Sequence, residues 1–331
     1  MPIWIQVLLL TATTIYQSIA SWLEDRSPPP GKLISVGSHR LHIYTVGEAS
    51  PTIVLDHSLG GVEGYFLIQE LSKLARVCIY DRAGYGWSDR APSPRSSDQI
   101  VKELNVLLSK AAVEPPYILV GNSFGSYNVR LYAHRFPEKV AGIVLTDALY
   151  ETEMLEMTAS LKVLRIIFTL GFLMSTLGSF LGIVRLLRIL NIFELLKPEL
   201  RHVSKDSLDS VKRSFCRPKH WITMTREMMN LDRSARQARA AAYFSETPIV
   251  SIKASSFFKP SIWTLVIPLK SANRLRENMH IKLCTLSAKF FQVEASSSSH
   301  FVWVDQPEII VDAVKKVLSE TDPLVAPIDS P

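Results

Sequence analysis

The pentapeptide Gly121-Asn122-Ser123-Phe124-Gly125 carries the clearest chemical signal in the sequence. It follows the apolar run 117–120 and precedes a helical pattern over 126–133, so the serine stands between a strand and a helix. Gly-x-Ser-x-Gly in this setting is typical of a nucleophile elbow, in which the glycines accommodate a strained backbone and the hydroxyl projects above the sheet. The following helix points its N-terminal amides and the positive end of its dipole at the same place. Ser123 is therefore the predicted nucleophile.

A serine hydroxyl is a weak nucleophile at neutral pH and needs a general base within hydrogen-bond reach. Among the eight histidines, His300 follows the last strand candidate and a serine-rich run, and Pro307 starts a closing helix soon after it. A loop after the final strand lies at the same sheet edge as the elbow, so His300 is the predicted base. Six other histidines are expected to be surface or packing residues: His39, His42, His134, His202, His220 and His280.

Short apolar segments alternate with helical patterns from Lys32 onward, which predicts an α/β fold with a mostly parallel central sheet flanked by helices. An initial antiparallel pair is expected over 33–36 and 41–46. Further strands are expected over 52–56, 76–80, 117–120, 142–146, 248–252 and 290–294. Helices are expected over 65–75, 97–112, 125–136 and 306–318.

The strand pattern is interrupted between about 150 and 245, where a helical sequence rich in Leu, Met, Arg and Lys predicts an inserted cap. Within it, Ile166–Val184 has no charged residue and is long enough to cross a bilayer. One crossing would separate strands of the same sheet, so we reject a membrane span here. We favour a buried cap helix over a lid that dips into the membrane interface.

The N-terminal segment Ile3–Ala20 is also free of charged residues and long enough to span a bilayer. The alternative is a secretory signal peptide cleaved after Ser18-Ile19-Ala20, but no basic region precedes the apolar run. We favour an uncleaved single-pass membrane anchor, with secretion after cleavage as the alternative. The predicted organisation is an anchor or signal segment over 1–23, a linker over 24–31, a core made of 32–149 and 246–320, a helical cap over 150–245 and a disordered tail over 321–331.

The composition narrows the class of protein. The 331 residues can bury a large core, carry a net charge of +6 and are 47% hydrophobic. No Lys/Arg run is interleaved with aromatic residues, so we expect no nucleic-acid partner, whereas a positive charge suits an anionic membrane surface. Cys78, Cys216 and Cys284 lie far apart and fit neither a metal site nor a disulfide framework, and Cys78 is expected in the core. We expect no metal and no cofactor.

Four segments together resemble the α/β-hydrolase superfamily, in its serine-nucleophile branch of proline-iminopeptidase-like and esterase-like enzymes. They are 52–61 (TIVLDHSLGG), 80–89 (YDRAGYGWSD), the elbow, and His300 with Asp305-Gln306-Pro307-Glu308. The resemblance covers about 31–150 and 245–318, and it implies an α/β-hydrolase fold and an acyl-enzyme mechanism. Serine at position 123 argues against the haloalkane dehalogenase and epoxide hydrolase branches, which use aspartate there.

The resemblance also implies an acid that orients His300. Most members carry it after the strand that corresponds to 248–252, but the segment 253–259 has no carboxylate. Some members place it after the preceding strand, where Asp147 follows 144–146, so Asp147 is the predicted acid. Glu277 is the alternative acid, and a dyad without an acid is the third possibility.

An oxyanion hole needs two amides that point at the developing negative charge. The amide of Phe124, directly after the nucleophile, is one predicted donor. The resemblance matches His57 and Ser58 to a His-Gly pair and makes the amide of Leu59 the second donor. Ser58 replaces the usual glycine, and Asn122 stands where the family often has histidine. Asp81 and Arg82 are expected to shape a turn and to brace the site.

These observations lead to a serine hydrolase that cleaves a carboxylic ester or an amide of a small, apolar substrate. The basic, apolar cap has no cluster of carboxylates for a free amino group, which favours esters over a proline-iminopeptidase-like aminopeptidase activity. The missing acid in the usual loop and Ser58 keep open a non-catalytic or acyl-transferring membrane protein.

Overall fold

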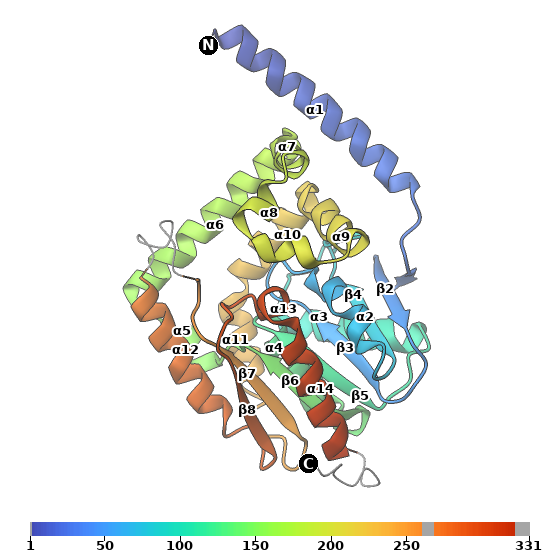
Figure 1. Ribbon diagram of the computed structural model, residues 1–331, viewed down its shortest axis with the longest axis vertical. Helices are drawn as coiled ribbons and strands as arrows, with labels where there is room; N and C mark the ends of the chain where they lie inside the picture. Colours follow the sequence, from blue (N-terminus) through green and yellow to red (C-terminus); the bar gives the residue numbers. More distant parts are fainter. Residues whose placement is uncertain (1, 260–267, 322–331) are drawn as a thin grey trace.

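An eight-stranded sheet forms the centre of the computed structural model, which describes residues 2–259 and 268–321 (Figure 1). Its strand order is β1-β2-β4-β3-β5-β6-β7-β8. The β1–β2 and β2–β4 pairs are antiparallel and all other pairs are parallel, so the predicted fold class is confirmed. The strands are β1 (Lys32–Ser35), β2 (Arg40–Val46), β3 (Thr52–Asp56), β4 (Val77–Asp81), β5 (Tyr117–Asn122), β6 (Val140–Thr146), β7 (Ile249–Ala254) and β8 (Phe290–Ala295).

Different helices cover the two faces of the sheet. On one face, α3 (Ser97–Lys110) and α4 (Gly125–Arg135) pack on the strands, and the i, i+3, i+7 spacing of Val101, Leu104 and Leu108 turns one side of α3 into the core. On the other face lies α14 (Pro307–Thr321). Because β3, β4 and β5 are covered on both sides, all of their residues are buried, as their unbroken apolar runs predict.

The helices between β6 and β7 fall within 150–245, where the sequence predicts the cap (Figure 1). They are α5 (Glu151–Leu155), α6 (Ala159–Phe180), α7 (Ile183–Ile189), α8 (Ile192–Leu196), η3 (Pro198–His202), α9 (Lys205–Phe215), α10 (Pro218–Met229) and α11 (Leu231–Ala238). The prediction of a buried cap helix over Ile166–Val184 is wrong. Only Leu161 and Ser179 are buried in α6, because the helix packs on α10 with one side only and leaves the other side open.

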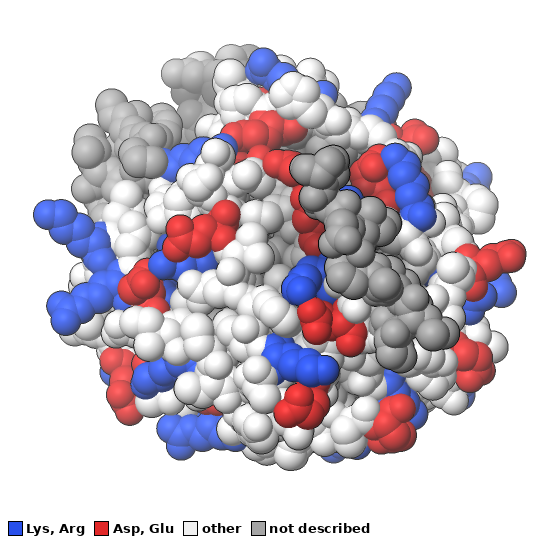
Figure 2. Space-filling view, turned by 60° about the horizontal axis from the view of Figure 1, so that its bottom comes forward, with Lys and Arg blue, Asp and Glu red and all other residues white. Residues whose placement is uncertain are grey.

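The N-terminal helix α1 (Ile3–Arg26) is long and apolar, and its first turns extend away from the body (Figure 1). By length and composition α1 and α6 are the two described helices that are able to cross a membrane. By contrast, Lys and Arg alternate with Asp and Glu on the face shown in Figure 2, which lies toward the lower end of Figure 1. Apart from Thr321, the predicted tail lies outside the described residues.

Two segments differ from the sequence-based expectation. The helix expected over 65–75 is replaced by η1 (Glu63–Phe66) and the short α2 (Ile68–Leu71), and the Gly64 amide in η1 donates to His57 Nδ1 at 3.0 Å. The helix α12 (Leu269–Leu283), between β7 and β8, is not predicted at all. Its buried side includes Arg276 and His280, and these two polar residues obscure the apolar periodicity.

Candidate active site

Ser123 lies at the sharp turn between β5 and α4. Its φ of 48° is left-handed, a conformation that side chains rarely adopt, and its amide donates to the carbonyl of Thr146 on β6 at 2.9 Å. The flanking glycines permit the turn because a Cβ at Gly121 would collide with the backbone of Gly125, and one at Gly125 would collide with the carbonyl of Asp56. The elbow geometry thus follows from the residue types at these positions.

His300 lies on the loop between β8 and α13 (Val302–Asp305), next to the elbow. The hydroxyl of Ser123 lies 2.9 Å from its Nε2, so the hydroxyl donates and the ring accepts. The ring of Phe257 stacks on the imidazole, with centroids 4.9 Å apart and planes inclined by 13°. The loop is also tied to Asp305, which accepts bonds from the amide and the hydroxyl of Ser299. His300 is therefore held at the distance a general base needs.

Asp147 follows β6 directly and completes a chain of three hydrogen-bonded side chains. Its Oδ2 lies 2.5 Å from Nδ1 of His300, and the carboxylate is buried. A left-handed φ of 41° turns the chain here, and the Asp147 amide donates to the carbonyl of Ile252 at 2.8 Å. The structure thus brings Ser123, His300 and Asp147 together although the acid follows β6 rather than β7.

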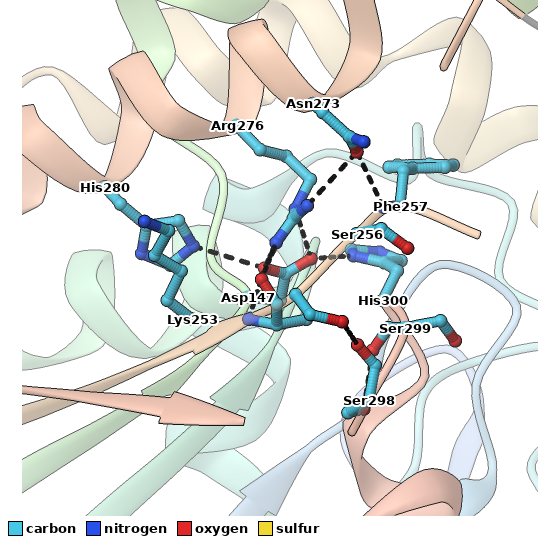
Figure 3. A network of polar contacts seen from close by, with 12 residues as sticks. Asp147, Lys253, Ser256, Phe257, Asn273, Arg276, His280, Ser298, Ser299 and His300 are labelled. Carbon is cyan, nitrogen blue, oxygen red and sulfur yellow. Dashed lines mark hydrogen bonds and ion pairs between the residues drawn. The ribbon is translucent and has the colours of Figure 1, made fainter. Parts of the chain in front are cut away.

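Arg276 and His280, for which the sequence predicts no role in the site, also meet Asp147 (Figure 3). Both come from α12, one turn apart, so they lie on the same side of the helix. Arg276 donates to both oxygens of Asp147 from Nε, at 3.0 and 2.9 Å, and from Nη2 to Oδ1 at 2.8 Å. Nε2 of His280 lies 3.2 Å from Oδ1. The expectation that His280 is a mere surface or packing residue is wrong, since it touches the candidate acid.

These contacts set the charge state of Asp147. Burial raises the pKa of its carboxyl, but hydrogen bonds from His280 and His300 and the positive charges of His300 and Arg276 act in the opposite direction. The pKa therefore lies well below its ordinary value of 3.8. Asp147 is ionised throughout the neutral range and accepts every hydrogen bond offered to it.

Glu277, the alternative acid, faces elsewhere. Its carboxylate pairs with Lys253 Nζ at 2.7 Å and its side chain is 52% exposed. Within residues 2–259 and 268–321 it forms no hydrogen bond or ion pair with His300, whose Nδ1 is already bound by Asp147.

The two predicted oxyanion donors flank Ser123. Phe124 precedes the first turn of α4 and is buried, and Leu59 lies in the loop after β3; both line the same cavity as Ser123. Neither amide donates a hydrogen bond to another described residue. The N-terminal end of α4 adds a favourable field for negative charge at this point.

A polar network fixes the loop that carries Leu59. Buried Arg82 donates to the carbonyl of His57 at 2.8 Å and to that of Ser58 at 2.7 Å, and it pairs with Glu227 of α10 at 2.9 Å. The sequence-based expectation that Arg82 braces the site agrees with these contacts. Asp81 does not share them: its carboxylate binds Nδ1 of His42 at 3.0 Å.

Glu63 supports the same loop from the other side. Its Oε1 accepts from the amide of Ser58 at 2.8 Å and from Nδ2 of Asn122 at 3.0 Å. Burial raises the pKa of this carboxyl, while His57 and the hydrogen bond from the Ser58 amide lower it to below the ordinary 4.5. Ser58 and Asn122, the two departures from the family pattern, are thus linked through one carboxylate.

A cavity of about 400 Å³ opens above Ser123 and His300, and its walls are almost entirely apolar. A second cavity of about 300 Å³ adjoins it and shares Ser58, Leu59, Asn122, Met224 and Phe301 with the first. The polar side chains of the first cavity are few, and its only carboxylate among the described residues is Asp147. The apolar wall includes Met154, Met157, Leu161, Leu164, Phe168, Phe172, Met228, Leu231, Phe257, Phe258, Leu275 and Met279.

No cluster of three or more His, Cys, Asp or Glu side chains suited to a metal ion occurs within the described residues. The chemistry that the arrangement can perform is nucleophilic: a hydroxyl, a base that accepts its proton, an ionised acid behind the base, and two free amides.

Comparison with known proteins gives a partial family match and a fold. Residues 51–168 match the family described as alpha/beta hydrolase fold. An uncharacterized vacuolar membrane protein of Saccharomyces cerevisiae is 30% identical over 114 residues, 32% of this chain and 17% of that protein. A 1-acylglycerol-3-phosphate O-acyltransferase of Arabidopsis thaliana is 31% identical over 139 residues, 37% of this chain and 32% of that protein.

The matched parts cover less than half of the first curated relatives, at 37%, 15% and 42% of their lengths. In three dimensions the similarity extends much further. The crystal structure of the enol-lactonase from Burkholderia xenovorans LB400 has a TM-score of 0.60 and 17% identity, and the match covers 87% of this chain and 100% of that one. The family match over residues 51–168 and the similarity in three dimensions both show that this chain has an α/β-hydrolase fold.

Proposed function

We propose that the protein is a serine hydrolase that cleaves carboxylic esters through an acyl-enzyme. The observation that carries the proposal is the chain of hydrogen bonds from Ser123 to His300 to Asp147 at the base of an apolar cavity. Each member lies within hydrogen-bond reach of the next, which is the criterion by which such triads are recognised.

In the proposed mechanism, Oγ of Ser123 attacks the ester carbonyl carbon while Nε2 of His300 takes the hydroxyl proton. The carbonyl oxygen becomes an oxyanion that accepts hydrogen bonds from the amides of Leu59 and Phe124. When the tetrahedral species collapses, the C–O bond to the alcohol breaks and His300 returns its proton to the leaving oxygen. Water, deprotonated by His300, then attacks the acyl-enzyme and releases the acid and Ser123.

Asp147 orients the imidazole and stabilises its positive charge in both steps. Arg276 and His280 act through Asp147 as positioning residues, because they bind the carboxylate that orients His300. Hydrogen bonds from His280 and His300, together with the charge of Arg276, keep the acid ionised, so that it accepts a hydrogen bond from the N–H group at Nδ1 of His300 instead of donating one.

The cavity favours esters over aminopeptidase substrates. A free amino group requires an anionic partner, and the single carboxylate that lines the cavity in the described part of the chain is already bound by Arg276, His280 and His300. The apolar wall instead suits an acyl chain, whose burial contributes about 0.8 kcal/mol per CH₂ group.

Acyl transfer is a second candidate function, because the same acyl-enzyme can be attacked by an alcohol in place of water. The relative named as a 1-acylglycerol-3-phosphate O-acyltransferase, and the cavity that presents little polar surface to water, support it. The test is to supply an ester together with an acceptor alcohol. Formation of more new ester than free acid would favour transfer over hydrolysis.

We also propose that α1 is retained as a single-pass membrane anchor. Its Gln17, which lies before the candidate cleavage site, is buried against the cap: Nε2 donates to the carbonyl of Cys216 at 2.7 Å, and Oε1 accepts from Arg185 at 2.5 Å. Cleavage after Ala20 would remove Gln17 and leave these partners without it. The relative named as a vacuolar membrane protein is consistent with a membrane location.

The test is hydrolysis of p-nitrophenyl esters with acyl chains of increasing length, beside aminoacyl p-nitroanilides, by the full chain in detergent. We expect turnover of esters, with kcat/KM rising with chain length until the cavity is filled. Ser123→Ala should lower kcat by about 10⁶-fold, as loss of a triad serine does in another fold. Turnover of aminoacyl substrates alone would overturn the ester assignment, and unchanged activity of Ser123→Ala would overturn the mechanism.

A further inference from the structure

The helix α6 has two apolar sides that face different surroundings. On its inner side, Leu161, Leu164, Phe168 and Phe172 line the cavity above Ser123. On its outer side, seven residues repeat with helical spacing and are 50–67% exposed: Val163, Ile166, Ile167, Leu170, Leu173, Met174 and Leu177. The helix therefore separates the cavity from a large apolar surface that no described part of the chain covers.

A helix that is apolar on all sides is stable either inside a protein core or in lipid. The outer side of α6 is not in a core, and the apolar surface continues onto α7, where Ile183, Leu186 and Ile189 are 40–54% exposed. A patch of this extent exceeds the scattered apolar residues that are normal for a surface in water.

The N-terminal helix α1 contacts the C-terminal end of α6, where the chain continues into α7. Gly182, between α6 and α7, has a φ of +78°, and a Cβ there would collide with the carbonyl of Thr13 on α1. Close by, Arg185 of α7 is 5% exposed and pairs with Glu24 at 2.6 Å. Figure 1 shows α7 against the middle of α1 rather than against its end.

This contact constrains how α1 can enter a bilayer. Thr13 lies midway between Trp4 and Trp22, which are exposed at the two ends of α1 where tryptophans anchor helices at membrane interfaces. The distance along the helix from Thr13 to either tryptophan is about 13 Å. The middle of α1 therefore lies in the hydrocarbon when both tryptophans are at a membrane interface. An α1 inserted in this way carries the α6–α7 end of the cap into the acyl layer.

We infer that the outer side of α6 lies in the bilayer and forms the wall between lipid and the cavity, so that the substrate is an ester of a membrane lipid. This inference rests on the proposed ester hydrolase and names its substrate class. The acyl chain of such a lipid passes from one apolar surrounding to another, and the scissile ester reaches Ser123 without crossing water.

The first experiment measures the surroundings of α6 in the full chain reconstituted into phosphatidylcholine vesicles. Leu173→Cys on α6 and Ile281→Cys on α12, whose native side chain is 61% exposed, are each labelled with the fluorophore NBD in a Cys284→Ser background. We expect 12-doxyl phosphatidylcholine to quench NBD at position 173 and iodide to quench it at position 281. Quenching of position 173 by iodide overturns the inference. A blue-shifted emission that doxyl lipid does not quench also overturns it, since it indicates a protein partner or a second copy.

The second experiment separates substrate delivery from chemistry. The triple variant Leu170→Gln, Leu173→Gln and Leu177→Gln should lower hydrolysis of a fluorogenic long-chain glycerolipid in the vesicles by about tenfold. Hydrolysis of soluble p-nitrophenyl butyrate should stay unchanged, as should both activities of Ile281→Gln. If the triple variant hydrolyses both substrates as fast as wild type does, the inference is wrong, but the proposed ester hydrolase is unaffected. Ser123→Ala tests the proposed hydrolase alone. Loss of both activities supports the hydrolase, and retention of both contradicts it.

Discussion

Arg276 and Asp147 form a buried, two-pronged ion pair, in which Nε of Arg276 lies 2.9 Å from Oδ2 and Nη2 lies 2.8 Å from Oδ1. His300 binds the same Oδ2 at 2.5 Å. The candidate acid therefore has a fixed orientation that depends on α12, an element far from the elbow in sequence.

Replacing Arg276 by Met should destabilise the fold by about 3 kcal/mol, because removing one partner of a buried ion pair leaves the other charge uncompensated. It should also lower kcat with little change in KM, since Asp147 assists only the steps in which His300 is charged. Arg276→Lys keeps the charge but not the forked guanidinium group. Its stability and its kcat should therefore lie between those of Arg276→Met and wild type. Urea unfolding and ester kinetics provide the measurements, and a variant with reduced stability but unchanged kcat would show that Arg276 is only structural.

Asp147→Asn should lower kcat by about 10⁴-fold, the effect of the corresponding change in a serine protease triad, because an amide does not hold the imidazole in its productive form. Glu277→Gln is the matched control, since Glu277 pairs with Lys253 near the surface and should leave kcat unchanged. Steady-state hydrolysis of a p-nitrophenyl ester distinguishes the two. An unimpaired Asp147→Asn enzyme would remove Asp147 from the mechanism.

The depressed pKa of Asp147 predicts a pH dependence of stability. Above the ordinary value of 3.8 the carboxylate is charged in both the folded and the unfolded chain, and its native partners stabilise the fold. As pH falls below this value, the unfolded chain takes up a proton before the folded chain does. The stabilisation that the native partners of Asp147 provide therefore shrinks, and it is lost once the pH passes the pKa of Asp147 in the folded protein. The difference in unfolding free energy between wild type and Asp147→Asn should be largest near pH 7 and smaller at pH 3. A difference that grows toward low pH would contradict the assigned direction.

The oxyanion loop depends on Glu63, whose Oε1 binds the amide of Ser58 and the side chain of Asn122. Glu63→Ala should lower kcat by up to about 10²-fold, the scale of losing one oxyanion donor. Glu63→Gln keeps an acceptor for the Ser58 amide and should retain more activity than Glu63→Ala. Ester kinetics at saturating substrate check the order, and equal kcat values for wild type and both variants would show that the loop does not need this carboxylate.

The parts of the fold and site that follow local rules were predictable. Buried parallel strands have unbroken apolar runs, and the elbow has its own residue signature, so the positions of Ser123 and His300 relative to the sheet follow from the sequence. Asp147 was reached only through the family resemblance, because nothing near Thr146 in sequence distinguishes an orienting acid from a structural one.

Other features depend on tertiary contacts that leave little local trace. Arg276 and His280 occupy core-facing positions of α12, so their polar character hides both the helix and its role. The composition of α6 is equally typical of a buried cap helix and of one that faces lipid, and only its packing on a single side separates the two. The prediction of burial failed for that reason.

Labelling by a fluorophosphonate shows directly whether Ser123 is an activated nucleophile. The probe's phosphorus should bond to Oγ of Ser123 with loss of fluoride, shown by an intact-mass increase of one adduct and by a modified peptide that contains Ser123. Ser123→Ala should not be labelled, and Asp147→Asn should be labelled more slowly than wild type. Folded wild-type protein that shows no adduct, or an adduct on another residue that persists in Ser123→Ala, would show that Ser123 is not the activated nucleophile.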